Sequence, residues 1–243
     1  MIIRQVKFAF DLLQFMADRQ APATISEIAE HFGWPRSSTV NQVETLCHLG
    51  LMHEPVHRQG YLPTSRLLDL ASELVRADSR GSDLDALVQA VAAQSGETAT
   101  VAAIAGNHGL FINAAESTNP IRYFAEAGQR IPLHATAAGR ALLSQVPEKQ
   151  LQALLKRTEY IRYSENTPMS AEAVTALIAE GRERGYYVNS DGYAKDLVGV
   201  AIPMRLDGRQ LSLLVAGPIY RMSGNHAELA EMLRDCRQRI IGS

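Results

Sequence analysis

The hydrophobic positions of the first thirty residues recur at helical spacing and predict two short helices. The apolar face of the first helix is formed by Val6, Ala9, Phe10, Leu13 and Met16. A capping box, Thr24-Ile25-Ser26-Glu27, opens the second helix, because its hydroxyl and carboxylate can satisfy the first free amides. The buried stripe of this second helix is predicted to be Ile25, Ile28, Ala29 and Phe32, and Gly33 ends it.

A third helix is predicted from Pro35, whose missing N–H costs nothing at the first helical position, to Leu49. With about 100° of rotation per residue, one side of this helix holds Thr39, Val40, Val43, Leu46 and Cys47. The other side holds Ser37, Ser38, Asn41, Thr45 and His48, with Arg36 and Gln42 at its edges. A nearly uncharged face of small polar residues suits a helix that lies close to the edges of nucleic-acid bases.

Two short strands follow, Leu51–Glu54 and Gly60–Leu62, around the loop Pro55–Gln59. Helix, turn, helix and hairpin together predict a winged helix-turn-helix. A further helical pattern over Ser65–Arg80 has a broad apolar face, as expected for a linker helix that packs on a second copy. The segment Ser79–Ser82 then indicates a boundary.

The remaining residues alternate strands with helices and predict an α+β domain. The predicted strands are Thr98–Ala105, Leu110–Ala115, Tyr186–Asn189, Gly199–Leu206 and Leu211–Gly217, the last two joined by a type I′ turn at Asp207-Gly208. The predicted helices are Thr136–Gln145, Pro147–Arg157, Ser170–Arg184 and Ala227–Ile241. The predicted organisation is therefore a winged helix in residues 1–64, a linker helix in 65–80 and an α+β domain in 81–243.

Composition indicates the class of protein to which these elements belong. The 243 residues carry a formal net charge of −2 and 46% hydrophobic side chains, which is typical of a globular protein. We find neither a signal peptide nor an apolar run long enough to cross a membrane, so a soluble, cytoplasmic protein without membrane association is expected. Cys47 and Cys236 are far apart and form no disulfide framework; both are expected to lie in the core.

The near-neutral charge argues mildly against a nucleic-acid binder. Residues 1–64 hold five basic side chains (Arg4, Lys7, Arg19, Arg36, Arg58) and six acidic ones, a net charge of −1 with histidines neutral. Counterion release should therefore contribute little to DNA binding by one such domain. Tight binding would require two or more linked domains on a palindromic site.

No sequence motif supports catalysis or a cofactor. His53-Glu54-Pro55-Val56-His57 matches the zinc-protease pattern H-E-x-x-H, but that chemistry needs a continuous helix, which Pro55 would disrupt. A hydrolase-like site at His134 and Thr136 lacks an orienting acid nearby in the sequence. We therefore predict no enzyme, no catalytic residue, no metal site and no cofactor.

Several segments resemble the IclR (isocitrate lyase regulator-type) family of bacterial transcriptional regulators over nearly the whole chain. In the first domain the resemblance rests on ISEIAEHFGWPRSSTVNQVETLCHLGLM and QGYLPTSRLLDLA. In the second it rests on GQRIPLHATAAGRALL, GRERGYYV, VAIPM and LLVAGP. The resemblance implies a GAF-like effector-binding domain after the linker helix. It also implies a homodimer or homotetramer that binds double-stranded operator DNA and senses a small organic or aromatic acid.

By position, the third helix corresponds to the family's recognition helix. The resemblance places Arg36, Ser37, Ser38, Asn41, Gln42 and Thr45 against DNA, and the wing residues His57 and Arg58 could reach phosphate or the minor groove. Gln42 departs from the family, which usually has an aliphatic residue there. Gln42 either adds a base contact or caps the edge of the core.

The family's ligand positions correspond here to Tyr123, Ala137, Ala138, Asn189, Leu197, Gly199, Leu214 and Ala216. Asn189 stands where an Asp is common, Gly199 where a Cys is common, and Leu214 and Ala216 replace serines. An apolar wall favours a ligand with apolar bulk, so an aromatic or branched acid is expected. Small residues before and in the Thr136 helix either let a carboxylate approach backbone amides or merely allow close packing of the helix on the sheet, and the resemblance favours the first. His134 is either a ligand contact or a satisfied structural histidine.

A second interpretation stays open at this point. Helix-turn-helix units also serve as protein interfaces, and an uncharged polar face fits that role too. In this alternative the chain is a metabolite-sensing protein whose helix-turn-helix binds another protein. Loss of operator binding on mutation of Asn41 and Ser38, with oligomerisation retained, would separate the two readings.

Overall fold

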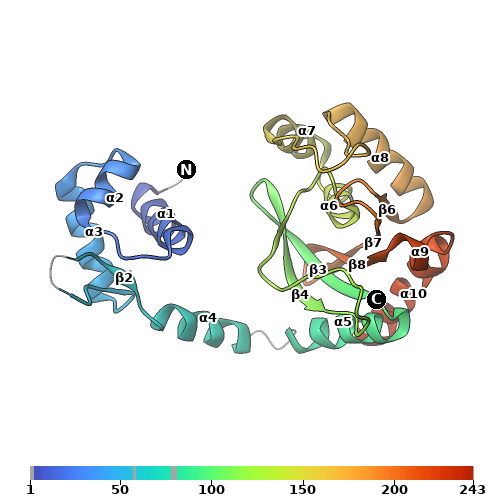
Figure 1. Ribbon diagram of the computed structural model, residues 1–243, viewed down its shortest axis with the longest axis horizontal. Coiled ribbons are helices and arrows are strands. Elements are labelled where there is room, and N and C mark those ends of the chain that lie inside the picture. The colour runs from blue at the N-terminus through green and yellow to red at the C-terminus, as the bar shows by residue number, and fades with distance from the viewer. Residues whose placement is uncertain (1–2, 57–58, 78–80, 243) are drawn as a thin grey trace. The chain divides into compact units, whose positions relative to one another are not determined.

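A computed structural model describes residues 3–56, 59–77 and 81–242, and its elements are labelled in Figure 1. The chain forms two compact units, Met1–Ser79 and Arg80–Ser243. The predicted wing residues His57 and Arg58 lie outside the described residues.

The first unit contains the expected helix-turn-helix. Its elements are α1 (Arg4–Arg19), α2 (Ile25–Phe32), α3 (Arg36–His48), the short strands β1 (Met52–His53) and β2 (Leu62–Pro63), and α4 (Arg66–Ala77). The predicted capping box is confirmed, because the Thr24 hydroxyl accepts from the Glu27 amide while the Glu27 carboxylate accepts from the Thr24 amide. Pro35 caps α3 in an extended conformation instead of being its first helical residue, so α3 starts one residue later than predicted.

The buried face of α1 differs from the predicted one. Phe8, Leu12 and Met16 are buried, whereas Val6 and Phe10 are 55% and 70% exposed. The ring of Phe8 stacks on Trp34 from the turn between α2 and α3, with ring centroids 3.5 Å apart. Since α1 carries apolar residues around most of its circumference, the stacking partner decides which stripe faces the core.

The second unit is built on one antiparallel sheet with the strand order β5-β4-β3-β8-β7-β6. The strands are β3 (Thr98–Ala105), β4 (His108–Ala115), β5 (Arg130–Ile131), β6 (Tyr187–Ser190), β7 (Leu197–Leu206) and β8 (Arg209–Pro218). Asp207 and Gly208 both have positive φ, 51° and 75°, as the predicted type I′ turn requires. Strand β8, which follows β7 in the chain, lies between β3 and β7 in the sheet.

Helices cover both faces of this sheet (Figure 1). One face packs on α5 (Gly81–Ser95) and α10 (His226–Ile240); the other packs on α6 (Ala137–Leu143), with α7 (Glu148–Arg157) and α8 (Ala171–Arg184) beyond it. A one-turn helix, α9 (Ile219–Met222), precedes α10. The α+β architecture is confirmed. Helix α5 was not predicted, because its first residues, Gly81 and Ser82, have the composition of a loop.

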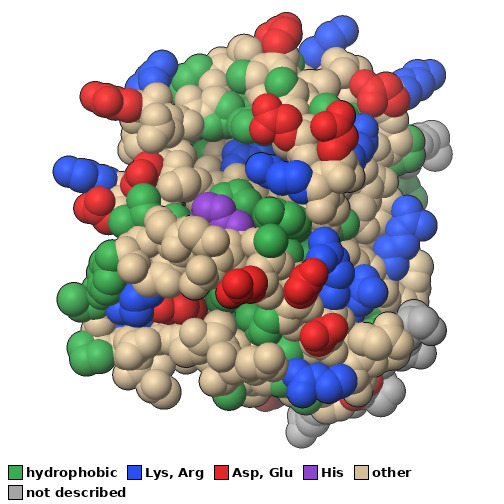
Figure 2. Space-filling view, turned by 90° about the vertical axis from the view of Figure 1, so that its right-hand side faces the viewer, with side chains coloured by type: hydrophobic (Ala, Val, Ile, Leu, Met, Phe, Trp, Pro, Cys, Tyr) green, Lys and Arg blue, Asp and Glu red, His purple; other side chains and the backbone are tan. Residues whose placement is uncertain are grey.

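On the face of the molecule shown in Figure 2, acidic and basic side chains are interspersed, in keeping with the net charge of −2. None of the described helices is both long and apolar enough to cross a membrane. Both cysteines are free thiols: Cys236 is buried in the core against α5, and Cys47 is half-buried on the inner side of α3.

Candidate functional site

The helix α3 presents two chemically different faces. Thr39, Val43 and Leu46 are buried against the first unit's core, as predicted. The predicted outward residues Arg36, Ser37, Ser38, Asn41, Thr45 and His48 are all exposed. The side chain of Thr45 donates a 2.6 Å hydrogen bond to the backbone carbonyl oxygen of Asn41, one helical turn earlier. The outward face is therefore a row of small hydrogen-bonding side chains.

Gln42 lies at the edge of this face and is half-buried. It contributes to the wall of an apolar groove of about 470 Å³ between α1 and α3, together with Val6, Phe10 and Leu49. Gln42 also lines a second recess beside Phe8 and Trp34. Its position against α1 agrees with a residue that covers the edge of the core.

The H-E-x-x-H segment is not helical in its described part. His53 is on strand β1 and Pro55 follows it in an irregular loop, while His57 lies outside the described residues. Among the described residues, no three or more His, Cys, Asp or Glu side chains come close enough together to hold a metal ion.

A row of residues on one face of the sheet forms the floor of a pocket. The antiparallel register aligns Asn189 of β6 with Gly199 of β7, and Gly199 with Ala216 of β8. Paired residues of an antiparallel sheet point to the same face, so these three side-chain positions lie together. Leu214 is two residues before Ala216 on β8 and shares that face. The predicted ligand residues on the three strands thus meet.

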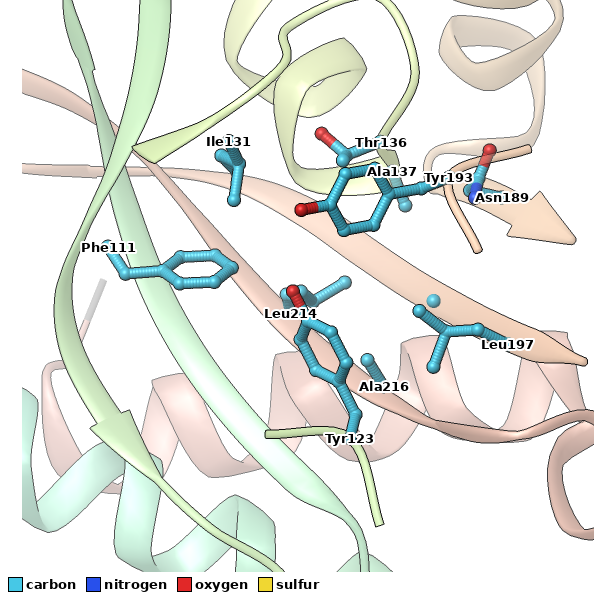
Figure 3. A pocket seen from close by; sticks show the side chains of 11 residues that line it. Phe111, Tyr123, Ile131, Thr136, Ala137, Asn189, Tyr193, Leu197, Leu214 and Ala216 are labelled. Carbon is cyan, nitrogen blue, oxygen red and sulfur yellow. The ribbon is translucent and has the colours of Figure 1, made fainter. Parts of the chain in front are cut away.

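The complete pocket brings together seven of the nine predicted ligand residues (Figure 3). The predicted residues that line it are Tyr123, Ala137, Asn189, Leu197, Gly199, Leu214 and Ala216. The cavity is small, about 20 Å³, which is room for about one water molecule. An organic ligand therefore needs the lining side chains to move outward before it can enter.

Two predicted ligand residues do not line this cavity. His134 is 2% exposed; its Nε2 lies 3.1 Å from the carbonyl oxygen of Ile161, its ring contacts Tyr160 and Tyr163, and burial lowers its pKa. These contacts favour a structural role for His134 over a contact with a ligand. Ala138 is fully buried in the contact between α6 and the sheet, where its small side chain permits close packing.

Four lining residues were not predicted as ligand contacts: Phe111, Ile131, Thr136 and Tyr193. Phe111 and Ile131 belong to neighbouring strands, and the alternation of β4 could have indicated that Phe111 faces the same side as the pocket. Tyr193 comes from the loop between β6 and β7. Asp191 and Asp196 have positive φ at its two ends, and no helix or strand periodicity reveals where such a loop places a side chain.

The pocket contains hydroxyl groups and one amide but no charged side chain. In Figure 3 the hydroxyl groups of Tyr123 and Tyr193 both point into the space between Phe111, Ile131 and Leu214. Burial raises the pKa of both tyrosines, so both hydroxyls stay protonated and can donate a hydrogen bond at neutral pH. The lining is therefore apolar apart from a few hydrogen-bond donors.

The hydroxyl of Thr136 and the ring of His134 both form hydrogen bonds with backbone groups. The Thr136 hydroxyl donates to the carbonyl oxygen of Pro132 and accepts from the amide of Gly139, which caps α6. Among the described residues, the side chains of Thr136 and His134 form no hydrogen bond with each other or with an acidic side chain. The pair thus lacks the nucleophile–base contact that a hydrolase-like site needs.

Tyr123 is positioned by a network behind the pocket. The hydroxyl of Thr98, fully buried on β3, donates a 2.6 Å hydrogen bond to the carbonyl oxygen of Tyr123 and accepts from the amide of Ser117. Arg221 donates to the carbonyl oxygen of Ile121 and forms an ion pair with the buried Glu97. These bonds attach the loop that carries Tyr123 to strand β3 through Thr98 and to helix α9 through Arg221.

Comparison with known proteins places both units in one family. The family model described as "Bacterial transcriptional regulator IclR C-terminal" matches residues 82–241, and the model of the IclR helix-turn-helix domain matches residues 8–54. The regulator SauR of Cupriavidus necator is 27% identical over 217 residues, covering 88% of this chain and 86% of that protein. The transcriptional repressor IclR of Escherichia coli is 24% identical over 216 residues, covering 87% and 79%.

Solved structures share the fold along almost the whole chain. A crystal structure of an IclR-type regulator from a Silicibacter species superposes with a TM-score of 0.82 at 21% identity, covering 98% of this chain and 97% of that one. An IclR homologue from Microbacterium hydrocarbonoxydans, crystallised with 4-hydroxybenzoate, superposes with a TM-score of 0.74 at 21% identity, covering 98% and 96%. With one model covering most of its length and a second covering its helix-turn-helix, this chain belongs to the IclR family of bacterial transcriptional regulators.

Proposed function

We propose that this chain is a ligand-responsive regulator of a metabolic operon whose helix α3 binds the operator through base edges. The observation that carries this proposal is the exposed row Ser37, Ser38, Asn41 and Thr45 on a helix whose other side is buried. An Asn side chain can pair with adenine through two hydrogen bonds, and Ser and Thr accept several partners. Arg36 would contact guanine or phosphate, and His57 and Arg58 would extend the contact from the wing.

The experiment first isolates the operator by selecting genomic fragments that the purified chain retains, and then measures variants on it. Asn41→Ala would remove a bidentate base contact and should weaken operator binding about 5- to 150-fold. Ser38→Ala should weaken operator binding less. Gln89→Ala is the matched control, since Gln89 is exposed on α5 in the other unit. Unchanged affinity of the Asn41 variant in a titrated gel shift would contradict the proposal.

We propose further that the operator is palindromic and is bound by a homodimer or homotetramer. The net charge of −1 over residues 1–64 gives one domain little electrostatic affinity. Leu68 and Leu70 on α4 are 70% and 47% exposed, which supports an apolar contact with a second copy. Light scattering during size-exclusion chromatography tests the assembly. Equally tight binding to a half-site and to the full operator would contradict the palindrome.

The alternative function, a helix-turn-helix that binds protein, is favoured by one observation. The groove of Val6, Phe10 and Leu49 adjoins the polar face of α3 at Gln42 and Thr45. If this alternative holds, Asn41→Ala and Ser38→Ala leave DNA binding unchanged, whereas Phe10→Ser abolishes binding of the partner protein. If the DNA-binding proposal holds, the α3 variants lose the operator and keep their oligomeric state.

For the second unit we propose an effector that is a small organic acid with apolar bulk, aromatic or branched. The support is a lining in which Phe111, Ile131, Leu197 and Leu214 face a few hydrogen-bond donors. The proposed effector contacts are Tyr123, Ala137, Asn189, Leu197, Gly199, Leu214 and Ala216, to which we add Tyr193. The complex of a homologue with 4-hydroxybenzoate makes that acid the first probe.

Thermal unfolding with a panel of metabolite acids tests this part. At a concentration of 100 times its Kd, an effector stabilises the folded chain by about 2.7 kcal/mol, which raises the Tm of a unit of this size by about 5 to 10 °C. Glyoxylate and pyruvate serve as the small controls. Stabilisation by these two acids alone, without a response to larger acids, would contradict an effector with apolar bulk.

The division of labour that we propose is a DNA-binding domain in residues 1–64, a linker in 65–80 and an effector-binding domain in 81–243. A ligand changes operator affinity only if it binds two states of the protein with different affinity. The proposed carrier is the linker helix α4, which follows β2 directly in the chain. Measuring operator affinity with and without the effector determines whether the ligand releases DNA or promotes binding.

A further inference from the structure

Arg140 of α6 is a buried cation without a counter-charge. It is 3% exposed, and its guanidinium donates to three neutral acceptors: the carbonyl oxygens of His134 and Val188 and Oδ1 of Asn189, at 3.2, 2.7 and 3.2 Å. None of the ion pairs among the described residues includes Arg140. A buried charge is costly unless a charge of opposite sign lies beside it.

The surroundings leave this charge largely uncompensated. Burial, and then the neighbouring cation Arg184, lower the pKa of Arg140 to about 10, so the guanidinium stays protonated at neutral pH. The acid that acts against this shift is Glu180, an exposed residue of α8 that makes no contact of ion-pair length with Arg140. The positive field of Arg140 therefore extends into the neighbouring side chains.

Asn189 connects this cation to the pocket. A guanidinium has only N–H donors, so the atom of the Asn189 amide that faces Arg140 must be the oxygen. The amide nitrogen Nδ2 is then the polar atom that Asn189 can offer to the pocket that it lines (Figure 3). A donor whose carbonyl oxygen accepts from a cation is polarised and donates more strongly.

We infer that Arg140 is a positioning residue that, through Asn189, makes the pocket select anions over neutral ligands of the same shape. This inference rests on the proposed effector pocket. If a carboxylate accepts from Nδ2 of Asn189, only the Asn189 amide separates it from the guanidinium of Arg140. The attraction between the two charges is stronger in this buried site than in water. We expect a carboxylic acid to bind about 10- to 100-fold more tightly than its amide.

Replacing Asn189 by Asp gives two effects of opposite sign. The new carboxylate would pair with Arg140, so the unliganded protein should unfold at a higher temperature than the wild type. The same carboxylate neutralises Arg140 and removes the Nδ2 donor, so the preference for an acid over its amide should fall at least about tenfold. A residue with a merely structural role would not couple a gain in stability to a loss of the preference for acids over amides.

The experiment measures Kd by calorimetry for benzoate and isovalerate, each beside its amide, benzamide or isovaleramide. The wild type should prefer both acids, and Asn189→Asp should lose that preference. Arg140→Lys keeps the charge and should keep a preference for the acids, whereas Arg140→Gln should bind acid and amide alike. If the Arg140 variants fail to fold, the Tm of unliganded Asn189→Asp and its two Kd ratios still decide the matter.

Two outcomes overturn the inference in distinguishable ways. Equal affinity of the wild type for an acid and its amide, or a lower Tm of Asn189→Asp than of the wild type, contradicts the role of Arg140 and leaves the proposed pocket standing. Absence of binding by all four probes and by the wider acid panel contradicts the proposed effector pocket itself, and anion selection with it.

Discussion

A Cβ atom on Gly139 would lie 2.3 Å from the carbonyl oxygen of Leu133. Helix α6 thus packs against the backbone of the preceding segment at a distance that only glycine permits. We predict that Gly139→Ala lowers the free energy of unfolding by about 1 to 3 kcal/mol or more, because backbone must shift to accept the methyl group. Gly81→Ala is the control, since nothing lies within 4 Å of its added Cβ. Equal urea midpoints for the two variants would refute this explanation.

The corrected face of α1 predicts a contrast between two neighbouring positions. Leu12 is fully buried, so Leu12→Ala should cost about 2 to 5 kcal/mol. Phe10 is 70% exposed, so Phe10→Ala should change the free energy of unfolding of the unassembled chain by no more than about 0.5 kcal/mol. Urea unfolding followed by the fluorescence of Trp34 reports on this unit. A larger loss for Phe10→Ala would restore the face predicted from the sequence.

The capping box makes the stability of the first unit depend on pH. Hydrogen bonds from the amide and hydroxyl of Thr24, and then the contact with Arg19, hold the pKa of Glu27 below its usual value. A lowered folded-state pKa means that this stabilisation is complete above the pKa of the unfolded glutamate and is lost as pH falls through the folded pKa. The effect of so exposed a carboxylate should stay below about 1 kcal/mol.

Glu27→Gln should therefore lose less stability than the wild type between about pH 5 and pH 3, whereas Glu30→Gln, an exposed position on the same helix, should follow the wild type. Thermal unfolding across this pH range measures the difference. Parallel pH profiles for the wild type and Glu27→Gln would show that the box contributes nothing through the charge of Glu27.

Gly199 sets the width of the proposed effector pocket. A Cβ atom there would lie 3.1 Å from Cδ1 of Leu214 and 3.6 Å from Cβ of Ala137, so a larger side chain would fill the space that an effector needs. We predict that Gly199→Val weakens binding of an aromatic acid at least about tenfold. Calorimetry measures the affinity, and the Tm of the unliganded variant shows whether the fold is intact. Unchanged affinity in a folded variant would mean that the ligand binds elsewhere.

The hydroxyl of Thr98 holds the loop that carries Tyr123. Thr98→Val keeps the shape but leaves the buried amide of Ser117 and the carbonyl oxygen of Tyr123 without their partner, at a cost of about 1 to 3 kcal/mol. Hydrogen exchange of residues 117–125 should become faster. Thr118→Val is the control, because Thr118 is exposed on the same loop. Equal exchange rates in both variants would argue against this role.

Elements of the fold could be predicted from the sequence where a signal within a few residues is enough to determine the local structure. The Thr24 capping box and the Asp207-Gly208 turn are such signals, because both are satisfied within four residues of chain. The face of α1 could not be chosen this way. Val6 and Phe10 fit the helical period as well as Phe8 and Leu12 do, and only the contact of Phe8 with Trp34 separates them.

The same distinction applies to the pocket. Residues on strands could be placed because the register carries Asn189, Gly199 and Ala216 to one face. Tyr193 could not, since its loop has no period. His134 and Arg140 were equally undetermined: a buried polar residue in a small-residue segment can face a ligand or the backbone, and the tertiary contacts alone show that both turn to carbonyl oxygens.

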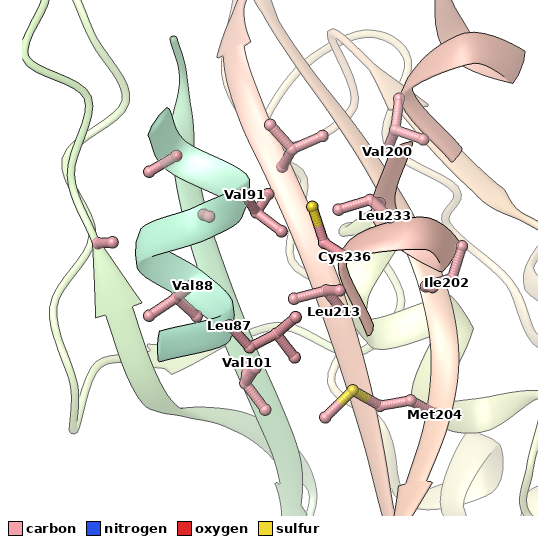
Figure 4. Close-up of a cluster of buried hydrophobic side chains, with 14 of the residues drawn as sticks. Leu87, Val88, Val91, Val101, Val200, Ile202, Met204, Leu213, Leu233 and Cys236 are labelled. Atoms are coloured by element: carbon pink, nitrogen blue, oxygen red, sulfur yellow. The ribbon is translucent and has the colours of Figure 1, made fainter. Parts of the chain in front are cut away.

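The position of β8 in the middle of the sheet has a consequence for biosynthesis. Leu213 of β8 packs between Val101 of β3 and residues of β7 in the core beneath the sheet (Figure 4). Until residues 209–218 have been made, the strands β5-β4-β3 and β7-β6 lack the strand that joins them into one sheet. The second unit can therefore close only after residues 209–218 have been made, whereas the helix-turn-helix, complete by residue 63, can fold long before.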